Sequence, residues 1–339
     1  MGDSIGGTMV KIILVGGTGR SGTSILKETL ALHPQAASLP FEYRFIIDPD
    51  GIVDFYAGFT AVWSPYIADR RLKRLERFLR TLAREPWYHR LAGRLIQWFD
   101  PRGRLLSPRA YHGWELNRHL PRFEHHVDTL MSELIAFSFP ACWVGTEGYT
   151  LHPRIYHSPP RSREELAPIL RKFIHNVIGD LLKETGKAFF VEDNTWNVLL
   201  AREILEILPQ ARIVHIYRDP RDVVASFSRQ RWSPRDKVQG ALWYRSMMSR
   251  WFEIRSSLPP HSLYEVSLER FVREPKEVLQ EICLFAEIPF HERMLQIDLS
   301  RSHSGRWKRE FNPEEKRQVQ EILGDLIRAL GYPLEEEGP

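Results

Sequence analysis

A glycine-rich segment near the start of the chain constrains its fold more than any other feature. It reads Gly16-Gly17-Thr18-Gly19-Arg20-Ser21-Gly22-Thr23-Ser24. An apolar run over 10–15 precedes it and a helical pattern over 25–30 follows it, which predicts a strand, a tight loop and a helix. Glycines let the backbone amides turn inward, and the helix points its positive end into the loop. We therefore expect the loop to bind an anion, with phosphate as the best candidate.

The loop departs from the P-loop of nucleoside triphosphatases at one position. The pattern G-x-x-x-x-G-K-[ST] fits from Gly17 to Gly22, but Thr23 stands where the lysine belongs. The cation is Arg20, inside the loop. A metal-dependent clamp on a γ-phosphate normally uses that lysine, so a P-loop kinase is the weaker hypothesis. A structural turn without a ligand is the other alternative at this point.

Regular alternation of helices and strands predicts the architecture of the second half of the chain. We expect strands over 188–192, 212–217 and 262–266, with helices over 196–208, after 218–222 and over 233–257. Capping signals at Ser162 and Asn312 predict helices that run to 186 and 330. Together with the first strand, and a short one expected over 36–39, this predicts an α/β fold: a P-loop-like three-layer sandwich with a central parallel sheet.

Residues 50–160 differ in character from what flanks them. Aromatic, histidine and arginine residues crowd between proline breaks, and helices are expected over 71–84 and after Pro86. We interpret this stretch as a helical, arginine-rich insertion on the acceptor side of one domain spanning 1–339. The sequence gives no information on oligomeric state.

Positive charge is concentrated in this insertion. The whole chain has a formal net charge of only +4, whereas residues 70–126 hold fourteen Lys or Arg against five Asp or Glu. Such a patch attracts anionic partners, although arginines on a helix also form ordinary solvated faces. We expect contact with an anionic acceptor or a membrane surface rather than with nucleic acid.

Cysteine and histidine usage argues against a metal site. Cys142 and Cys283 form no disulfide or metal pattern, which favours a reducing, cytoplasmic location. Between residues 112 and 157 the insertion carries six histidines: His112, His119, His125, His126, His152 and His157. They lack ligand spacing with supporting Cys or acidic residues, so we expect no metal.

A second anion site is indicated at the end of the expected strand 212–217. Arg218 leaves this strand, and Ser226 lies two turns along the following helix on the same side. An arginine fork and a hydroxyl suit a phosphate dianion. An ion pair that merely closes the turn, between Asp222 and either Arg218 or Arg221, is the alternative.

With these motifs the chain resembles sulfotransferases that use 3′-phosphoadenosine 5′-phosphosulfate (PAPS). Residues 17–24 resemble the family's 5′-phosphosulfate loop, and Arg218 with Ser226 matches the pair that binds the 3′-phosphate. The resemblance implies donor contacts from Gly19, Arg20, Ser21, Gly22, Thr23, Ser24, Arg218, Ser226, Ser304, Gly305 and Arg306. The last three belong to Ser304-Gly305-Arg306-Trp307-Lys308, which resembles the loop that closes over the 3′-phosphate. The likeness covers 10–48 and 186–330, and it implies a PAPS donor without a metal.

The resemblance also bears on catalysis. Asn194 and Trp196 stand where many cytosolic members carry a lysine and a histidine. Glu42, after His33-Pro34, is similar to the glutamate that serves as base in tyrosylprotein and some carbohydrate sulfotransferases. We therefore expect Glu42 to be the base, with Asp193 as its rival, and Arg20 to stabilise charge on the transferred group. The expected reaction is in-line sulfuryl transfer to the hydroxyl of a sugar, glycolipid or other small acceptor. A catalytically silent nucleotide-binding protein on the same fold is the alternative.

Overall fold

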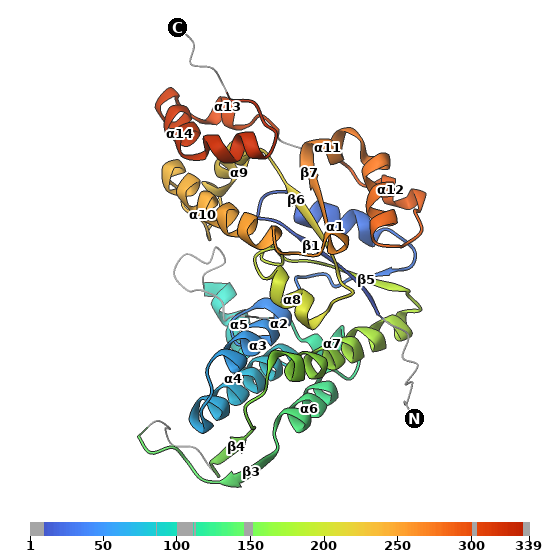
Figure 1. Ribbon diagram of the computed structural model, residues 1–339, viewed down its shortest axis with the longest axis vertical. Coiled ribbons are helices and arrows are strands. Elements are labelled where there is room, and N and C mark those ends of the chain that lie inside the picture. Colours follow the sequence, from blue (N-terminus) through green and yellow to red (C-terminus); the bar gives the residue numbers. More distant parts are fainter. Residues whose placement is uncertain are drawn as a thin grey trace. The chain divides into compact units, whose positions relative to one another are not determined.

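The contacts within the chain divide it into two units. One, here called the sheet unit, consists of residues 11–42 and 188–339, and the other, the helical unit, contains residue 10 and residues 43–187. The computed structural model describes residues 10–85, 87–99, 111, 113–145, 152–299 and 304–334 (Figure 1). His112 and part of the basic stretch 70–126 lie outside the described residues.

The sheet unit is built on five parallel strands in the order β2-β5-β1-β6-β7. They are β1 (Lys11–Gly16), β2 (Ala36–Ala37), β5 (Phe189–Asp193), β6 (Arg212–Tyr217) and β7 (Leu263–Ser267). The apolar strand that precedes the glycine loop is therefore central, with β5 and β6 on its two sides (Figure 1). This confirms the expected central parallel sheet.

Helices cover both faces of this sheet. On one face α1 (Thr23–Ala31), α11 (Leu268–Arg273) and α12 (Pro275–Phe285) share a buried core with Val15, Val191 and Ile216. Successive strand residues face opposite sides, and His215 accordingly contacts Trp251 of α10 (Lys237–Arg255) with ring centroids 4.8 Å apart. Helix α10 packs in turn with α9 (Pro220–Phe227) and α14 (Pro313–Ala329) (Figure 1). The three-layer α/β arrangement is confirmed.

The strand register gathers three loops at one edge of the sheet. Val15 pairs with Asp193 of β5 and Val214 of β6, so β1, β5 and β6 end within a few residues of one another. The segments that follow these strands begin at Gly17, Asn194 and Arg218. In open parallel sheets, ligands bind outside this carboxyl edge.

The helical unit contains mostly helices and one hairpin. Its longer helices are α3 (Ile52–Ala61), α4 (Pro65–Ala83), α5 (Trp87–Phe99), α6 (Phe123–Leu134) and α7 (Arg163–Thr185). The rings of Phe45, from α2 (Arg44–Ile47), Phe123 and Phe173 pack within 6.0 Å of one another in its core. Strands β3 (Phe137–Pro140) and β4 (Arg154–His157) pair antiparallel, which the sequence patterns did not predict. No helix among the described residues is long and apolar enough to cross a bilayer.

Three helix starts differ from the sequence expectation. Helix α8 (Ala201–Ile207) begins later than residue 196, because the Asn194 side chain accepts from the Trp196 amide and holds a turn there. Helix α10 begins at Lys237, where Asp236 caps it, rather than at 233. Helix α4 begins at Pro65 rather than at 71, with Ser64 accepting from the Ile67 amide. The capping box at Ser162 is confirmed.

Candidate active site

The glycine loop is folded tightly over the end of β1. Gly19, Arg20 and Gly22 have φ angles of 78°, 59° and 107°, in the left-handed region. At Gly17 an added Cβ would lie 2.2 Å from Ser21 Oγ and 2.8 Å from the Ile216 carbonyl oxygen, so a larger residue has no room there. The Ser21 hydroxyl is fully buried and has no hydrogen-bond partner in the described part of the chain. The loop backbone is therefore curled as an anion cradle requires.

Helix α1 opens directly into this loop. Its N-cap residue is Gly22, which supplies no capping side chain, and its first turn holds no acidic residue. The first-turn amides of a helix lack intrahelical partners and carry partial positive charge. Thr23 is buried at this end and Ser24 is exposed. Nothing acidic within the first turn competes with an incoming anion.

Three arginines from distant parts of the chain gather beside the loop. Arg20 Nε donates a hydrogen bond of 3.0 Å to Ser226 Oγ on α9. Burial lowers the pKa of Arg20, and repulsion from Arg218 and from Arg306 lowers it further. The guanidinium of Arg20 is thus close enough to those of Arg218 and Arg306 to be repelled by both, and a bound anion would relieve this repulsion.

Asp222 fixes the C-terminal segment to this cluster. Its carboxylate, 1% exposed, accepts from the Gly305 amide at 2.7 Å and from the Trp307 amide at 3.1 Å. Oδ2 also lies 3.5 Å from Arg218 Nη2. The Arg218–Asp222 ion pair considered from the sequence therefore exists, but the carboxylate in addition holds the turn that carries Ser304 and Arg306.

Arg221 supports the same turn by packing against Trp307. It forms a two-point ion pair with Asp219, with Nε and Nη2 at 3.0 and 2.8 Å from the two carboxylate oxygens. Its guanidinium stacks 4.0 Å from the centre of the Trp307 ring. The segment 218–226 thus contributes the site residues Arg218 and Ser226. It also contributes two residues that support the 304–307 turn, Arg221 and Asp222. Sequence reasoning missed both supports, since a contact over more than eighty residues leaves no local pattern.

Glu42 lies beyond β2 and is linked to the sheet edge through Asn194. Asn194 Nδ2 donates to Glu42 Oε2 at 3.3 Å, and the Asn194 amide donates to the Val15 carbonyl at 3.1 Å. Asn194 is fully buried, and its Oδ1 accepts from the Trp196 amide. The residue at the position of the family lysine is thus held at three points, one of which is the Glu42 carboxylate.

The rival carboxylate has a different environment. Asp193 ends β5, is buried, and lies 3.9 Å from Lys27 Nζ, which also donates to the Leu39 carbonyl at 2.7 Å. Lys27 also ties α1 to the segment that leads to Glu42.

Aromatic side chains border the loop on its outer side. An added Cβ at Gly19 would lie 2.9 Å from the Trp232 ring and 3.3 Å from the Thr195 methyl group. Trp232 is half exposed and packs edge-on against Phe227 and Trp243. Sequence reasoning missed Trp232, whose local signal is its position between Arg231 and the Ser233-Pro234 break.

Metal ligation finds no support in the described ranges. Among those residues no group of three or more His, Cys, Asp or Glu is placed to hold an ion. Cys142 is exposed and Cys283 is buried, and both are free thiols.

The chain is similar to several known proteins. A model of the Sulfotransferase family matches residues 13–292. The sulfotransferase domain of the Synechococcus PCC 7002 olefin synthase is similar with a TM-score of 0.48 and 15% identity over 96% of this chain and 95% of that one. Sulfotransferase STF9 from Mycobacterium avium gives 0.47 and 13%, covering 98% and 79%. An uncharacterized protein of Aquifex aeolicus (strain VF5) is 28% identical over 104 residues, which is 27% of this chain and only 13% of that protein's length.

Proposed function

We propose that this chain, which belongs to the sulfotransferase family, transfers a sulfuryl group from PAPS to a hydroxyl group of an acceptor. One observation carries the proposal. Arg20, Arg218 and Arg306 come from three separate segments, and Arg20 donates a hydrogen bond to Ser226. Burial, with repulsion from Arg218 and Arg306, lowers the pKa of Arg20. A ligand with two separate anionic ends explains why one fold gathers these cations at the edge of its sheet.

The two ends of the donor are assigned to different residues. Arg218, Ser226 and the turn Ser304–Arg306 hold the 3′-phosphate. The loop residues Gly19 to Ser24 hold the 5′-phosphosulfate, through backbone amides, the end of α1 and the Arg20 guanidinium. The Arg20–Ser226 hydrogen bond joins the two groups, so binding at one end positions a residue for the other.

The transfer step is an in-line displacement at sulfur. Glu42 removes the proton of the acceptor hydroxyl as its oxygen bonds to sulfur, and the bond from sulfur to the bridging phosphate oxygen breaks. Adenosine 3′,5′-bisphosphate leaves with the bonding electrons, and Arg20 stabilises the charge on the transferred sulfuryl group. Support for Glu42 comes from its place beyond β2 and from its hydrogen bond with Asn194, the residue that follows β5 at the carboxyl edge of the sheet.

We further propose that the chain works as one sulfotransferase domain in the cytoplasm. The helical unit is then the acceptor side, where the notably basic helix α4 lies. The acceptor carries the hydroxyl that receives sulfate, on a sugar, a glycolipid or another small molecule.

A transfer screen tests the proposal directly. The protein is incubated with PAPS and grouped acceptors, with a chelator present, and products are read by the mass of an added sulfuryl group. Sulfated product that disappears in Glu42→Gln supports the proposal. Magnesium-dependent turnover of ATP would favour the kinase instead, and tight binding of the bisphosphate with no product from any group would favour a silent nucleotide-binding protein.

A further inference from the structure

Helix α4 presents a row of arginines on one face. Arg70, Arg74 and Arg77 recur at the three- and four-residue spacing that places side chains along one stripe, with Arg71 beside them. The opposite stripe, formed by Leu72, Leu75 and Leu79, is buried in the core of the helical unit. The amphipathic pattern of α4 therefore fixes where the arginines point. Like charges at this spacing destabilise a helix unless something of opposite charge lies between them.

These four arginines line a pocket within the helical unit. Its volume is about 660 Å³, and Asp50, Tyr66 and Phe78 contribute to its walls. Asp50 is the only carboxylate among the described residues that line it, and its Oδ1 already lies 2.7 Å from Arg74 Nε. The lining thus contains four arginines and one acid, which gives the pocket an excess of positive charge. A concave site of this charge selects anions.

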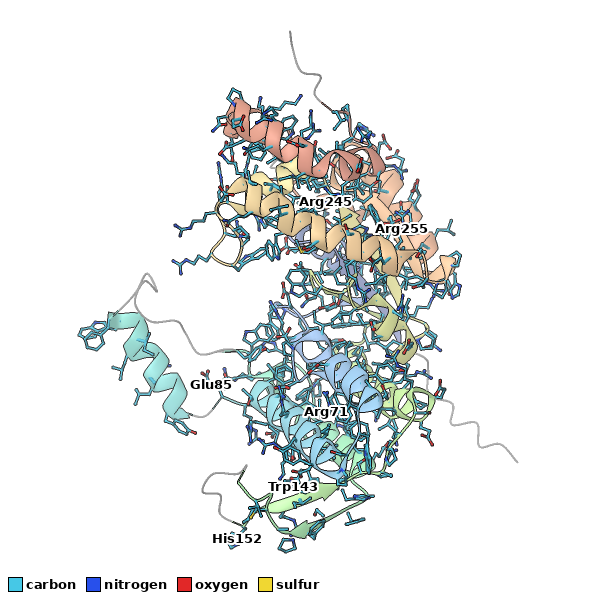
Figure 2. The ribbon with its side chains drawn as sticks, turned by 60° about the vertical axis from the view of Figure 1, so that its left-hand side comes forward. Arg71, Glu85, Trp143, His152, Arg245 and Arg255 are labelled. Atoms are coloured by element: carbon cyan, nitrogen blue, oxygen red, sulfur yellow. The ribbon has the colours of Figure 1, made fainter. Side chains whose placement is uncertain are left out.

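Arg71 is built into the wall by a specific contact. Its guanidinium packs against Gly58 of α3, where an added Cβ would lie 2.0 Å from Nη1. Its Nε is buried and has no hydrogen-bond partner among the described residues. Figure 2 shows Arg71 on α4 within the helical unit. A buried guanidinium nitrogen without a partner is costly, and an oxyanion in the pocket would supply the missing acceptor.

Aromatic residues at the pocket indicate that the ligand is more than a bare ion. The ring of Tyr66 lies edge-on to Trp143, with centroids 5.2 Å apart, and Trp143 Nε1 donates to the buried Asp69 at 3.0 Å. Phe78 forms an apolar part of the lining. Rigid aromatic faces beside arginine forks suit an organic body that carries a phosphate or sulfate ester.

We propose that this pocket is a second anion site, separate from the donor site, and that it binds a phosphate or sulfate ester group carried by the acceptor. The assignment to the acceptor rests on the proposed function. The existence of the anion site does not, because all of its residues belong to the helical unit. The arginine row then serves recognition: a charged acceptor is held by its ester group, and a neutral analogue of the same skeleton is bound weakly.

Calorimetric titration with inorganic pyrophosphate tests the site without any turnover. The full chain is first saturated with adenosine 3′,5′-bisphosphate, so that pyrophosphate reports on another site. If the bisphosphate does not bind, the proposed function fails and the same titration is run on the free protein. We expect pyrophosphate to bind the wild type and Arg71→Gln to weaken it about tenfold or more.

Two further variants distinguish binding in the pocket from a general effect of the positive charge on helix α4. Gly58→Ala raises helix propensity but pushes the Arg71 guanidinium aside, so it should weaken pyrophosphate binding without lowering the melting temperature. Arg80→Gln is the matched control, since Arg80 is on the same helix, pairs with Glu76 and Asp128, and does not line the pocket. Arg80→Gln should change the affinity for pyrophosphate less than about twofold, because a distant surface charge has only a small effect on binding.

Three outcomes would overturn the proposal. The first is unchanged pyrophosphate affinity in both Arg71→Gln and Gly58→Ala, and the second is an equal loss in Arg80→Gln. The third is binding only to vesicles of phosphatidylcholine with phosphatidylserine, lost in Arg71→Gln, with no affinity for soluble pyrophosphate. That last result would assign the arginine row to a membrane surface.

Discussion

Arg20 Nε donates a hydrogen bond of 3.0 Å to Ser226 Oγ, across 206 residues of sequence. The two residues belong to different anion-binding motifs, one in the glycine loop after β1 and one on the helix after β6. Because β1 and β6 are neighbours in the sheet, their following segments meet at its carboxyl edge. Through this contact the two motifs, which are far apart in the sequence, form a single site.

The Ser226 hydroxyl is predicted to contribute directly to binding of the donor. Ser226→Ala removes a hydrogen bond to a charged phosphate and the anchor of Arg20, a loss of about 1.5–3 kcal/mol, or roughly tenfold to a hundredfold in affinity. Calorimetry with adenosine 3′,5′-bisphosphate measures it. Ser228→Ala is the control, since that hydroxyl, at the C-terminal end of the same helix, donates only to the Ala225 carbonyl. Equal losses in the two variants would contradict the assignment.

Asp222 is predicted to keep the 304–307 turn in place. Asp222→Asn removes the charge and turns one acceptor oxygen into an amide donor, so the Gly305 or the Trp307 amide loses its partner. Exchange of these amides should accelerate by roughly tenfold to a hundredfold, as expected for loss of a charge-assisted hydrogen bond. Hydrogen exchange read by NMR measures this, with Asp325→Asn on the surface of α14 as the control. Unchanged protection at both amides would show that other contacts hold the turn.

Glu42 is predicted to act as the base. Glu42→Gln keeps the shape and the contact with Asn194 but loses basicity, so kcat should fall by roughly 10² to 10⁴ while the affinity for adenosine 3′,5′-bisphosphate is unchanged. Steady-state kinetics with the acceptor from the transfer screen measure both quantities. Asp193→Asn is the comparison. If that variant loses turnover and Glu42→Gln does not, the base is Asp193.

Asp180 is predicted to give the stability of the helical unit a dependence on acid pH. Burial favours a higher pKa for this carboxyl, but its hydrogen bonds from His126 and Arg122, 2.7 and 2.6 Å long, outweigh burial and hold the pKa below its ordinary value of 3.8. A lowered pKa in the folded state adds stability that is present above about pH 4 and is lost as the pH falls through the folded pKa.

Melting curves of wild type and Asp180→Asn test this dependence. The variant should be less stable at pH 7 by about 1.5–3 kcal/mol, since it loses hydrogen bonds to charged groups. The difference should shrink as the pH is lowered below 4. A difference that stays constant down to pH 2.5 would show that the carboxyl charge does not contribute.

The local elements of the sheet unit could be predicted because their signals are local. Glycines with left-handed φ angles, an apolar run before them and a helix after them define β1, the loop and α1 within two residues. The strand 212–217 and the capping box at Asn312 also match the structure. In each case the residues that determine the element lie within about ten positions of one another.

The remaining parts depend on contacts between distant residues. The turn at 305–307 is bound by Asp222, and Arg71 packs on Gly58, and neither contact leaves a periodic pattern. Hairpin β3–β4 was missed because Phe137 and Phe139 are exposed and Pro140 ends the first strand, so the usual alternation of buried and exposed residues is absent. The start of α8 was wrong because an asparagine turn replaced the first helical residues.

The most direct test of the account is the affinity of the protein for adenosine 3′,5′-bisphosphate compared with adenosine 5′-monophosphate, with a chelator present. We expect the bisphosphate to bind tightly without magnesium. At a hundredfold excess over Kd it should stabilise the folded protein by about 2.7 kcal/mol. The monophosphate should bind much more weakly, because Arg218, Ser226 and the 304–306 turn then hold no phosphate. Equal affinity for the two nucleotides, or binding that requires magnesium, would contradict the assignment of this cluster to the 3′-phosphate of PAPS.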